Sequence, residues 1–162
     1  METRHITESR AKVLLYFLGT LAFFAVYVLL PDPDHKLPVW GSWFFGLGTL
    51  VFLVLLIRPR QLTMDGEGFS VSGGLTRKPV NRMWRDVTGF FPLRIRMGSS
   101  VVGYNYSPDA APTARGAWLS KRISGADAGI SGLWPCSTRD LADKLNAYRN
   151  EALQVRATGS VS

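Results

Sequence analysis

The chain has 162 residues, with 19 Lys or Arg against 12 Asp or Glu and a formal net charge of +7. Two apolar runs lie within residues 1–57, so the remainder leaves room for one small domain and no more. The single cysteine, Cys136, excludes an internal disulfide, which fits a reduced compartment for the polar part of the chain.

The two apolar runs predict a transmembrane hairpin. Val13–Leu30 is an uninterrupted run of 18 uncharged, mostly apolar residues, and Val39–Ile57 is a second run of 19. Each makes a helix roughly 27–29 Å long, about the thickness of a bilayer's hydrocarbon core. The three prolines of Pro31–Pro38 end the first helix and delay the second, so we expect antiparallel neighbours. The absence of a polar stripe disfavours buried core helices, and the absence of a small-residue cleavage site disfavours a signal peptide.

The basic residues that flank the hairpin predict its orientation. Arg4, Arg10 and Lys12 precede it and Arg58 and Arg60 follow it, whereas the turn holds only Lys36. The positive-inside rule then predicts a multi-pass protein of the cytoplasmic (inner) membrane with both termini in the cytoplasm. No Asp, Glu, Lys, Arg or His lies inside either span, so we do not expect a transporter or channel.

A small-residue face on the second helix indicates close packing. Ser42, Gly46 and Thr49 share this face and allow approach of either the first helix or a second copy of the chain.

After the hairpin, short strands separated by glycine-containing turns predict a small antiparallel sheet or barrel. The expected strands are Gln61–Met64, Phe69–Ser72, Pro79–Trp84, Gly89–Met97 and Val101–Tyr106, with Ala117–Ile123 as one further strand. We expect Ser107–Gly116 to be an exposed loop. Ser124–Cys136 is glycine-rich and is expected to be irregular, with Ile130, Leu133 and Trp134 closing one end of a barrel.

The last predicted element is an amphipathic helix. Ser137 or Thr138 is the N-cap candidate, and Leu141, Leu145 and Tyr148 recur at helical spacing. Residues 154–162 are expected to form a frayed tail. The expected organisation is an N-terminal cytoplasmic tail over 1–12, a hairpin over 13–57 with spans at 13–30 and 39–57, a cytoplasmic domain over 58–153 and a flexible tail over 154–162.

A strand meander closed by one C-terminal amphipathic helix is the layout of a pleckstrin-homology-like (PH-like) barrel. The positions that carry the resemblance are Leu62, Asp65–Phe69, Trp84–Val87, Phe90, Ser137 and Leu141–Arg149. In these the chain resembles small bacterial membrane proteins with two transmembrane helices and a PH-like domain. The resemblance implies a membrane α + β fold: a two-helix hairpin followed by a small antiparallel β-barrel or sandwich closed by a C-terminal amphipathic α-helix. It further implies a scaffold that binds phospholipid headgroups, peptides or other proteins.

One set of basic residues points toward a chemical function. Arg77 and Lys78 lie in a predicted loop, Arg82 and Arg85 follow, and Arg94 and Arg96 alternate on one strand so that both project from the same face. Lys121 and Arg122 form another pair. Such side chains near a membrane bind phosphate oxygens or an anionic leaflet. The alternative is a solvated basic face without a specific ligand.

The motifs of common enzyme sites are missing from the sequence. There is no phosphate-binding glycine loop, no Cys or His pair at metal-ligand spacing, and no Ser–His–Asp set, because the two histidines, His5 and His35, lie outside the predicted domain. We therefore predict no catalytic residue, no cofactor and no metal. Cys136 is expected to be structural or incidental, Trp84, Phe90 and Phe91 to be core, and Asp86 to cap a turn.

The functional hypothesis is a membrane-anchored, non-catalytic scaffold or adaptor that binds another membrane or cytoplasmic protein. The alternative is binding or sensing of anionic phospholipid headgroups by the basic loops. Besides the lipid bilayer, the expected partners are therefore a protein or an anionic phospholipid, and no nucleic acid is expected.

Overall fold

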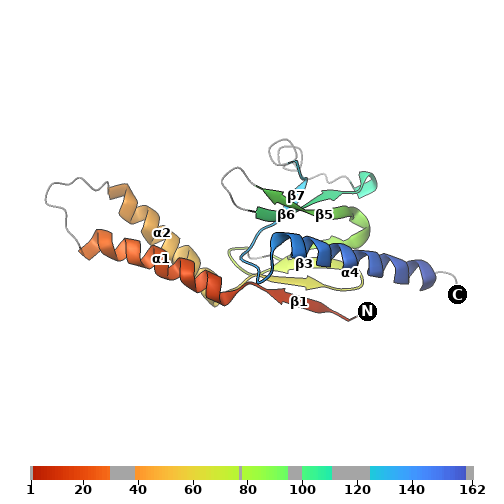
Figure 1. The fold of residues 1–162 in the computed structure, drawn as a ribbon, viewed down its shortest axis with the longest axis horizontal. Helices are drawn as coiled ribbons and strands as arrows, with labels where there is room; N and C mark the ends of the chain where they lie inside the picture. Colours follow the sequence, from red (N-terminus) through yellow and green to blue (C-terminus); the bar gives the residue numbers. More distant parts are fainter. Residues whose placement is uncertain (1, 30–38, 77, 95–99, 111–124, 160–162) are drawn as a thin grey trace.

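The computed structural model describes residues 2–29, 39–76, 78–94, 100–110 and 125–159. The helices are α1 (Arg10–Leu29), α2 (Val39–Ile57) and α4 (Thr138–Gly159), with short 3-10 helices η1 (Trp84–Asp86) and η2 (Pro108–Ala110). The strands are β1 (Arg4–Thr7), β2 (Gln61–Met64), β3 (Gly68–Ser72), β4 (Val80–Met83), β5 (Val87–Arg94), β6 (Ser100–Tyr106) and β7 (Ala128–Ile130). Figure 1 shows α1 and α2 projecting as a hairpin from a β domain that α4 covers.

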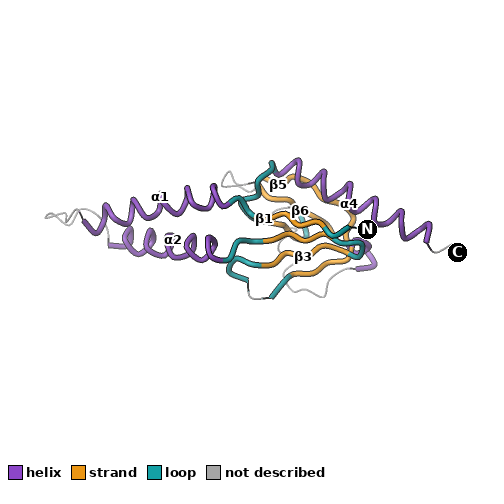
Figure 2. Tube along the Cα trace, turned by 90° about the horizontal axis from the view of Figure 1, so that it is seen from below, coloured by secondary structure: helices purple, strands orange, loops and turns teal. Residues whose placement is uncertain are grey.

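The hairpin is present as predicted. α1 and α2 lie side by side (Figure 2), and both are long and apolar enough to cross a membrane. Of their described side chains only Val13 and Leu55 are buried, and both lie in the turns next to the β domain. The two helices are therefore not the core of this fold, and their apolar surface is exposed.

Small residues bring the two helices together. A Cβ on Gly46 would lie 3.1 Å from the Phe24 ring, and one on Gly48 would lie 3.4 Å from Thr20 Cγ2. Gly46 thus faces α1 of the same chain, which is one of the two packing partners predicted for this small-residue face. The Thr49 hydroxyl instead donates a hydrogen bond to the Phe45 carbonyl of its own helix at 2.9 Å.

The β domain consists of two antiparallel sheets, in the orders β1-β2-β3-β4 and β5-β6-β7. Within the described residues no strand pairing joins the two sheets, so of the two predicted alternatives the barrel is wrong and the antiparallel sheet is confirmed. The reason is local: after β4 the chain makes the 3-10 turn η1 instead of extending, and strand pairing restarts with β5 in a separate sheet. The hydrophobic core lies between these sheets and α4.

Two strands are absent from the sequence-based prediction. β1 lies in the segment expected to be a tail, and it pairs with β2 in the register Ile6↔Leu62, so the hairpin is inserted between the first two strands of one sheet. β7 lies in the stretch expected to be irregular and pairs with β6 in the register Val102↔Ile130. The predicted strand Ala117–Ile123 lies outside the described residues, as does most of the predicted loop before it.

The C-terminal helix begins as predicted but ends later. Ser137 caps it: Ser137 Oγ accepts a hydrogen bond from the Asp140 backbone N–H at 3.1 Å and donates one to Asp140 Oδ2 at 2.7 Å. The predicted apolar face is buried, with Leu141 and Leu145 fully inaccessible. Residues 154–158, expected to be frayed, are helical and exposed, because α4 extends past the sheets that cover its earlier turns.

Of the three aromatic residues predicted for the core, Trp84 and Phe90 belong to it and Phe91 does not. Trp84 is 1 % exposed, and its indole N–H donates to the Asp65 carbonyl at 2.7 Å. Its ring packs against Phe69, Phe90 and Tyr148. Phe90 is buried and Phe91 is half-buried. Among the residues expected to plug one end, Ile130 and Trp134 are buried in this core and Leu133 is half-buried.

Candidate functional site

A buried carboxylate joins the hairpin to the β domain. Glu8 lies between β1 and α1 and is 4 % exposed. Its Oε2 accepts a hydrogen bond from the Arg60 backbone N–H at 3.1 Å, and its Oε1 accepts one from Leu133 N–H at 2.9 Å. The Glu8 N–H in turn donates to the Arg60 carbonyl at 3.0 Å, and Ser9 N–H donates to the Leu133 carbonyl at 2.8 Å. We call Glu8, Ser9, Arg60 and Leu133 the junction.

Two basic side chains reinforce the junction. Lys12 Nζ donates to the Trp134 carbonyl at 2.7 Å, and an Arg60 terminal nitrogen donates to the Ser131 carbonyl at 2.7 Å and to Ser131 Oγ at 2.9 Å. The chain entering the hairpin and the chain leaving it are therefore both bonded to the loop between β7 and α4. This arrangement holds the domain in a defined orientation to the two helices.

Strand direction divides the β domain into two ends. We call the end at which β1 stops and β2 starts the hairpin end, and the opposite end the far end. The registers Val71↔Val80 and Arg94↔Ser100 place the β3–β4 and β5–β6 connections at the hairpin end. The β2–β3 turn and both 3-10 helices lie at the far end.

The structure separates the predicted lipid-binding residues. Lys78 and Arg94 are exposed at the hairpin end, whereas Arg82 and Arg85 lie at the far end. The remaining predicted basic residues, Arg77, Arg96, Lys121 and Arg122, lie outside the described residues. The four described candidates are therefore not gathered into one site.

Arg82 has a structural role. Its Nε donates a hydrogen bond to Tyr106 Oη at 2.9 Å, and the guanidinium carbon lies 5.7 Å from the centre of that ring. Burial lowers the pKa of Arg82, but the hydrogen bond to Tyr106 and the interactions with the Tyr106 and Tyr104 hydroxyls together outweigh this, so the pKa is raised. This bond links β4 of one sheet to β6 of the other, so Arg82 contributes to holding the sheets together.

Arg85 and Asp86 form a weak surface pair. Arg85 Nε lies 3.6 Å from Asp86 Oδ1, with the Arg85 side chain 67 % exposed, so solvent screens most of their attraction. The Asp86 carbonyl accepts a hydrogen bond from Ser107 N–H at 2.9 Å. Asp86 thus connects η1 to the start of η2 through its backbone.

The hairpin end carries further basic residues beside Lys78 and Arg94. Exposed at this end are also Arg10, Lys12, Arg58 and Arg139. The described acidic residues nearest to them are the buried Glu8, the capping residue Asp140 and, one turn on, Asp143. Most other described carboxylates lie toward the far end: Glu2, Asp65, Glu67, Asp86, Asp109 and Asp127. The hairpin end is therefore predominantly basic, whereas the far end combines these carboxylates with a similar number of arginines: Arg4, Arg82, Arg85, Arg149 and Arg156.

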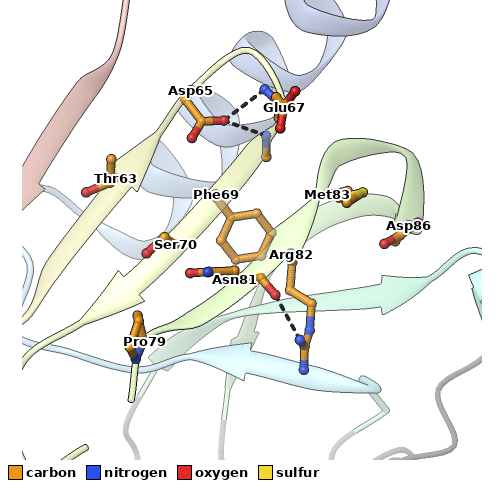
Figure 3. A pocket seen from close by; sticks show the side chains of 11 residues that line it. Thr63, Asp65, Glu67, Phe69, Ser70, Pro79, Asn81, Arg82, Met83 and Asp86 are labelled. Atoms are coloured by element: carbon orange, nitrogen blue, oxygen red, sulfur yellow. Dashed lines mark hydrogen bonds between the residues drawn. The ribbon is translucent and has the colours of Figure 1, made fainter. Parts of the chain in front are cut away.

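A hollow of about 660 Å³ lies over β3 and the edge strand β4 and extends from Pro79, before β4, to Asp86 at the far end; we call it the far-end hollow (Figure 3). Asp65, Glu67 and Asp86 lie on its border and Arg82 lies in its wall. Asp65 Oδ1 accepts hydrogen bonds from the backbone N–H groups of Glu67 and Gly68, both at 2.8 Å, and so shapes the turn. The Glu67 side chain is 82 % exposed, and its Oε1 lies 3.7 Å from an Arg156 terminal nitrogen on α4, a surface pair that solvent largely screens.

Other potential site residues have ordinary surroundings. His5 Nδ1 lies 3.0 Å from Thr63 Oγ1 on the neighbouring strand, and Cys136 is a half-buried free thiol. In the described ranges no three His, Cys, Asp or Glu residues converge as metal ligands would. Comparisons with protein-family models, with curated proteins and with solved structures found no match.

Proposed function

We propose that this protein is a membrane-anchored, non-catalytic scaffold with a PH-like domain. In this proposal α1 and α2 span the cytoplasmic membrane, both termini are cytoplasmic, and the far end of the domain binds another protein. The gathering of basic residues at the hairpin end of a firmly attached domain carries the proposal.

The architecture supports the PH-like assignment. Short antiparallel strands follow one another along the chain and one C-terminal amphipathic helix packs on them, which is the layout of that family. β1 and α4 belong to the same domain, since the Tyr148 hydroxyl donates to the Glu2 carbonyl and the Arg4 guanidinium carbon lies 5.7 Å from the centre of the Tyr148 ring. Both ends of the chain therefore lie on one side of any membrane that the hairpin spans.

The charges support the proposed orientation. Basic residues at the hairpin end lie next to the ends of the two apolar helices, where an anionic cytoplasmic leaflet would attract each by about 1 kcal/mol. The far end, which holds most of the described carboxylates, would then point away from the membrane. Because the junction fixes the domain relative to the helices, the hollow over β3 and β4 is presented to the cytoplasm and not to lipid.

The far-end hollow is the proposed protein-binding surface, and its acidic border favours a basic segment of the partner. A photo-crosslinking residue at Asn81, which lines the hollow, should capture a discrete protein in cells, and Glu67→Lys should abolish the capture. The matched control is the same crosslinker at Gln154, which is exposed on α4 away from the hollow. Capture of the same species from both positions, or from neither, would contradict the proposal.

A second candidate function rests on Lys78 and Arg94. Their exposure at the hairpin end favours binding of anionic phospholipid headgroups. Full-length protein extracted in mild detergent should then retain anionic phospholipid, and the double change Lys78→Glu with Arg94→Glu should remove it. Arg85→Glu at the far end is the control, and equal retention by both variants would argue against headgroup binding. A C-terminal reporter enzyme that is active only in the cytoplasm tests the orientation in the same cells.

A further inference from the structure

We propose that the β domain holds a second, separate site that takes a single-chain anionic amphiphile, such as a fatty acid or a lysophospholipid, from the membrane. The site is a cavity of about 300 Å³ between the two sheets. This volume lies at the lower end of the range of small-molecule sites, about 300–1,000 Å³. The proposal stands apart from the scaffold function, because the cavity is also lined by β6 and β7 of the second sheet, which do not line the far-end hollow, although Phe69 lines both.

The walls of the cavity suit a hydrocarbon chain. Phe69, Tyr104 and Ile130 form its deep part and are each less than 5 % exposed. Val71 and Val80 pair across β3 and β4 and line it nearer the surface. β4 and β7 end their sheets and α4 contacts β5 and β6, so the cavity occupies a side that α4 does not cover.

The mouth of the cavity lies at the hairpin end. Its exposed lining residues are Thr76 in the β3–β4 connection, Val80 at the start of β4 and Ser131 just after β7. These segments lie next to the ends of α1 and α2, which is the level of lipid headgroups if the helices span a membrane. An amphiphile can therefore enter from the bilayer tail first, with its headgroup left at the mouth.

Arg60 provides the headgroup contact. It lines the cavity, and no described carboxylate lies within 4.0 Å of its guanidinium. Its Nε is buried and has no hydrogen-bond partner among the described residues, although buried donors are nearly always bonded. Within the described residues the side-chain hydrogen bonds of this guanidinium go to Ser131 and not to a carboxylate. A guanidinium without a carboxylate partner beside an apolar cavity matches a carboxylate or phosphate joined to a hydrocarbon chain, because such a ligand supplies both the opposite charge and the apolar group.

The test uses the full-length chain in nanodiscs of phosphatidylcholine. The probe is a long-chain fatty acid with a photoactivatable group near its methyl end, and labelled residues are found by mass spectrometry. We expect labelling of Phe69, Val71 and Ile130, and weaker labelling by the methyl ester of the same probe. Arg60→Gln should reduce labelling by the acid about tenfold, since a charge-assisted contact is lost, whereas Arg60→Lys should keep most of it.

Val80→Trp tests the cavity without changing the charge. The indole should block the mouth and abolish labelling, whereas Asn81→Trp, the next residue on the same strand but on the opposite face, should not. The comparison of Val80→Trp with Asn81→Trp tests whether the probe enters the cavity even if the Arg60 variants fold poorly. Labelling confined to α1 and α2, or unaffected by Val80→Trp, would overturn the proposal. Protection by inorganic phosphate as strong as that by unlabelled fatty acid would also overturn it, by showing a site for a free anion.

Discussion

The hairpin and the β domain bury their apolar side chains in opposite ways. In the domain, fifteen residues form one buried cluster built around Trp84 and the inner face of α4. In the hairpin, aromatic residues as large as Phe44, Trp40 and Trp43 are more than 70 % exposed. The two buried hairpin residues, Val13 and Leu55, are covered where the helices meet the domain. The domain thus has a core of its own, whereas the hairpin exposes an apolar surface that is long enough to cross a membrane.

The largest expected effect of a single change is at Trp84. Trp84→Ala removes the largest fully buried side chain and its hydrogen bond to Asp65, and should lower the free energy of unfolding by about 3–5 kcal/mol. Phe44→Ala, in a side chain that is 72 % exposed, should change it by less than about 0.5 kcal/mol. The measurement is chemical unfolding of the full chain in detergent micelles, followed by circular dichroism. Equal losses in the two variants would mean that the hairpin is packed like a soluble core.

The next effect is at the junction, where the two regions meet. Glu8→Ala leaves the N–H groups of Arg60 and Leu133 without their acceptor, and should cost about 2–4 kcal/mol. Glu8→Gln keeps one acceptor oxygen and should cost less. Glu151→Ala, at an exposed position on α4, is the control.

Hydrogen exchange at the two amides shows whether the junction itself has opened. In Glu8→Ala the amides of Arg60 and Leu133 should exchange faster, while the Trp84 amide should exchange as slowly as before. If all three amides accelerate together, Glu8 stabilises the whole domain and not the attachment of the hairpin in particular.

A smaller effect is expected inside the hairpin. A Cβ at Gly41 would lie 2.6 Å from the Tyr27 ring, so Gly41→Leu should push the helices apart and cost about 1–3 kcal/mol. A Cβ at Gly19 would meet no atom of the neighbouring helix within 4 Å, and Gly19→Leu controls for the gain in helix propensity. Thermal unfolding of both variants in micelles compares them. Equal melting temperatures would show that contact between α1 and α2 contributes little.

The sequence predicts those elements whose signal is local. Uncharged runs of bilayer length mark the hairpin, and turn glycines mark the strands between Gln61 and Tyr106. β1 escapes prediction because it has four residues, two of them Arg4 and His5, and its partner β2 follows only after the whole hairpin. β7 has three residues and pairs with one strand only. Such short strands are defined by non-local pairing, which a single sequence does not display.

The candidate sites are predictable to a smaller extent, for the same reason. The sequence identifies Lys78 and Arg94 as exposed basic residues but cannot separate them from Arg82, because strand register decides which end each one occupies. In the sequence Glu8 is a single carboxylate before an apolar run. Only the fold brings the backbone N–H groups of Arg60 and Leu133 to its two carboxylate oxygens. The cavity beside Arg60 exists because the two sheets do not close, which contradicts the predicted barrel.

The dependence of stability on pH should differ between a buried tyrosine of the domain, Tyr104, and an exposed tyrosine of the hairpin, Tyr16. Burial raises the pKa of Tyr104, which is 4 % exposed, well above its usual value near 10. Above pH 10 the unfolded chain loses this proton and the folded domain keeps it, so stability that is complete below pH 10 is lost as pH rises. The slope for one such group approaches about 1.4 kcal/mol per pH unit.

Tyr104→Phe should therefore make the fall of stability above pH 10 less steep by this slope, whereas Tyr16→Phe, at an exposed position on α1, should leave the fall of stability unchanged. Unfolding midpoints between pH 9 and pH 11 test this, and an identical alkaline slope in Tyr104→Phe and the parent chain would show that Tyr104 ionises without unfolding the domain.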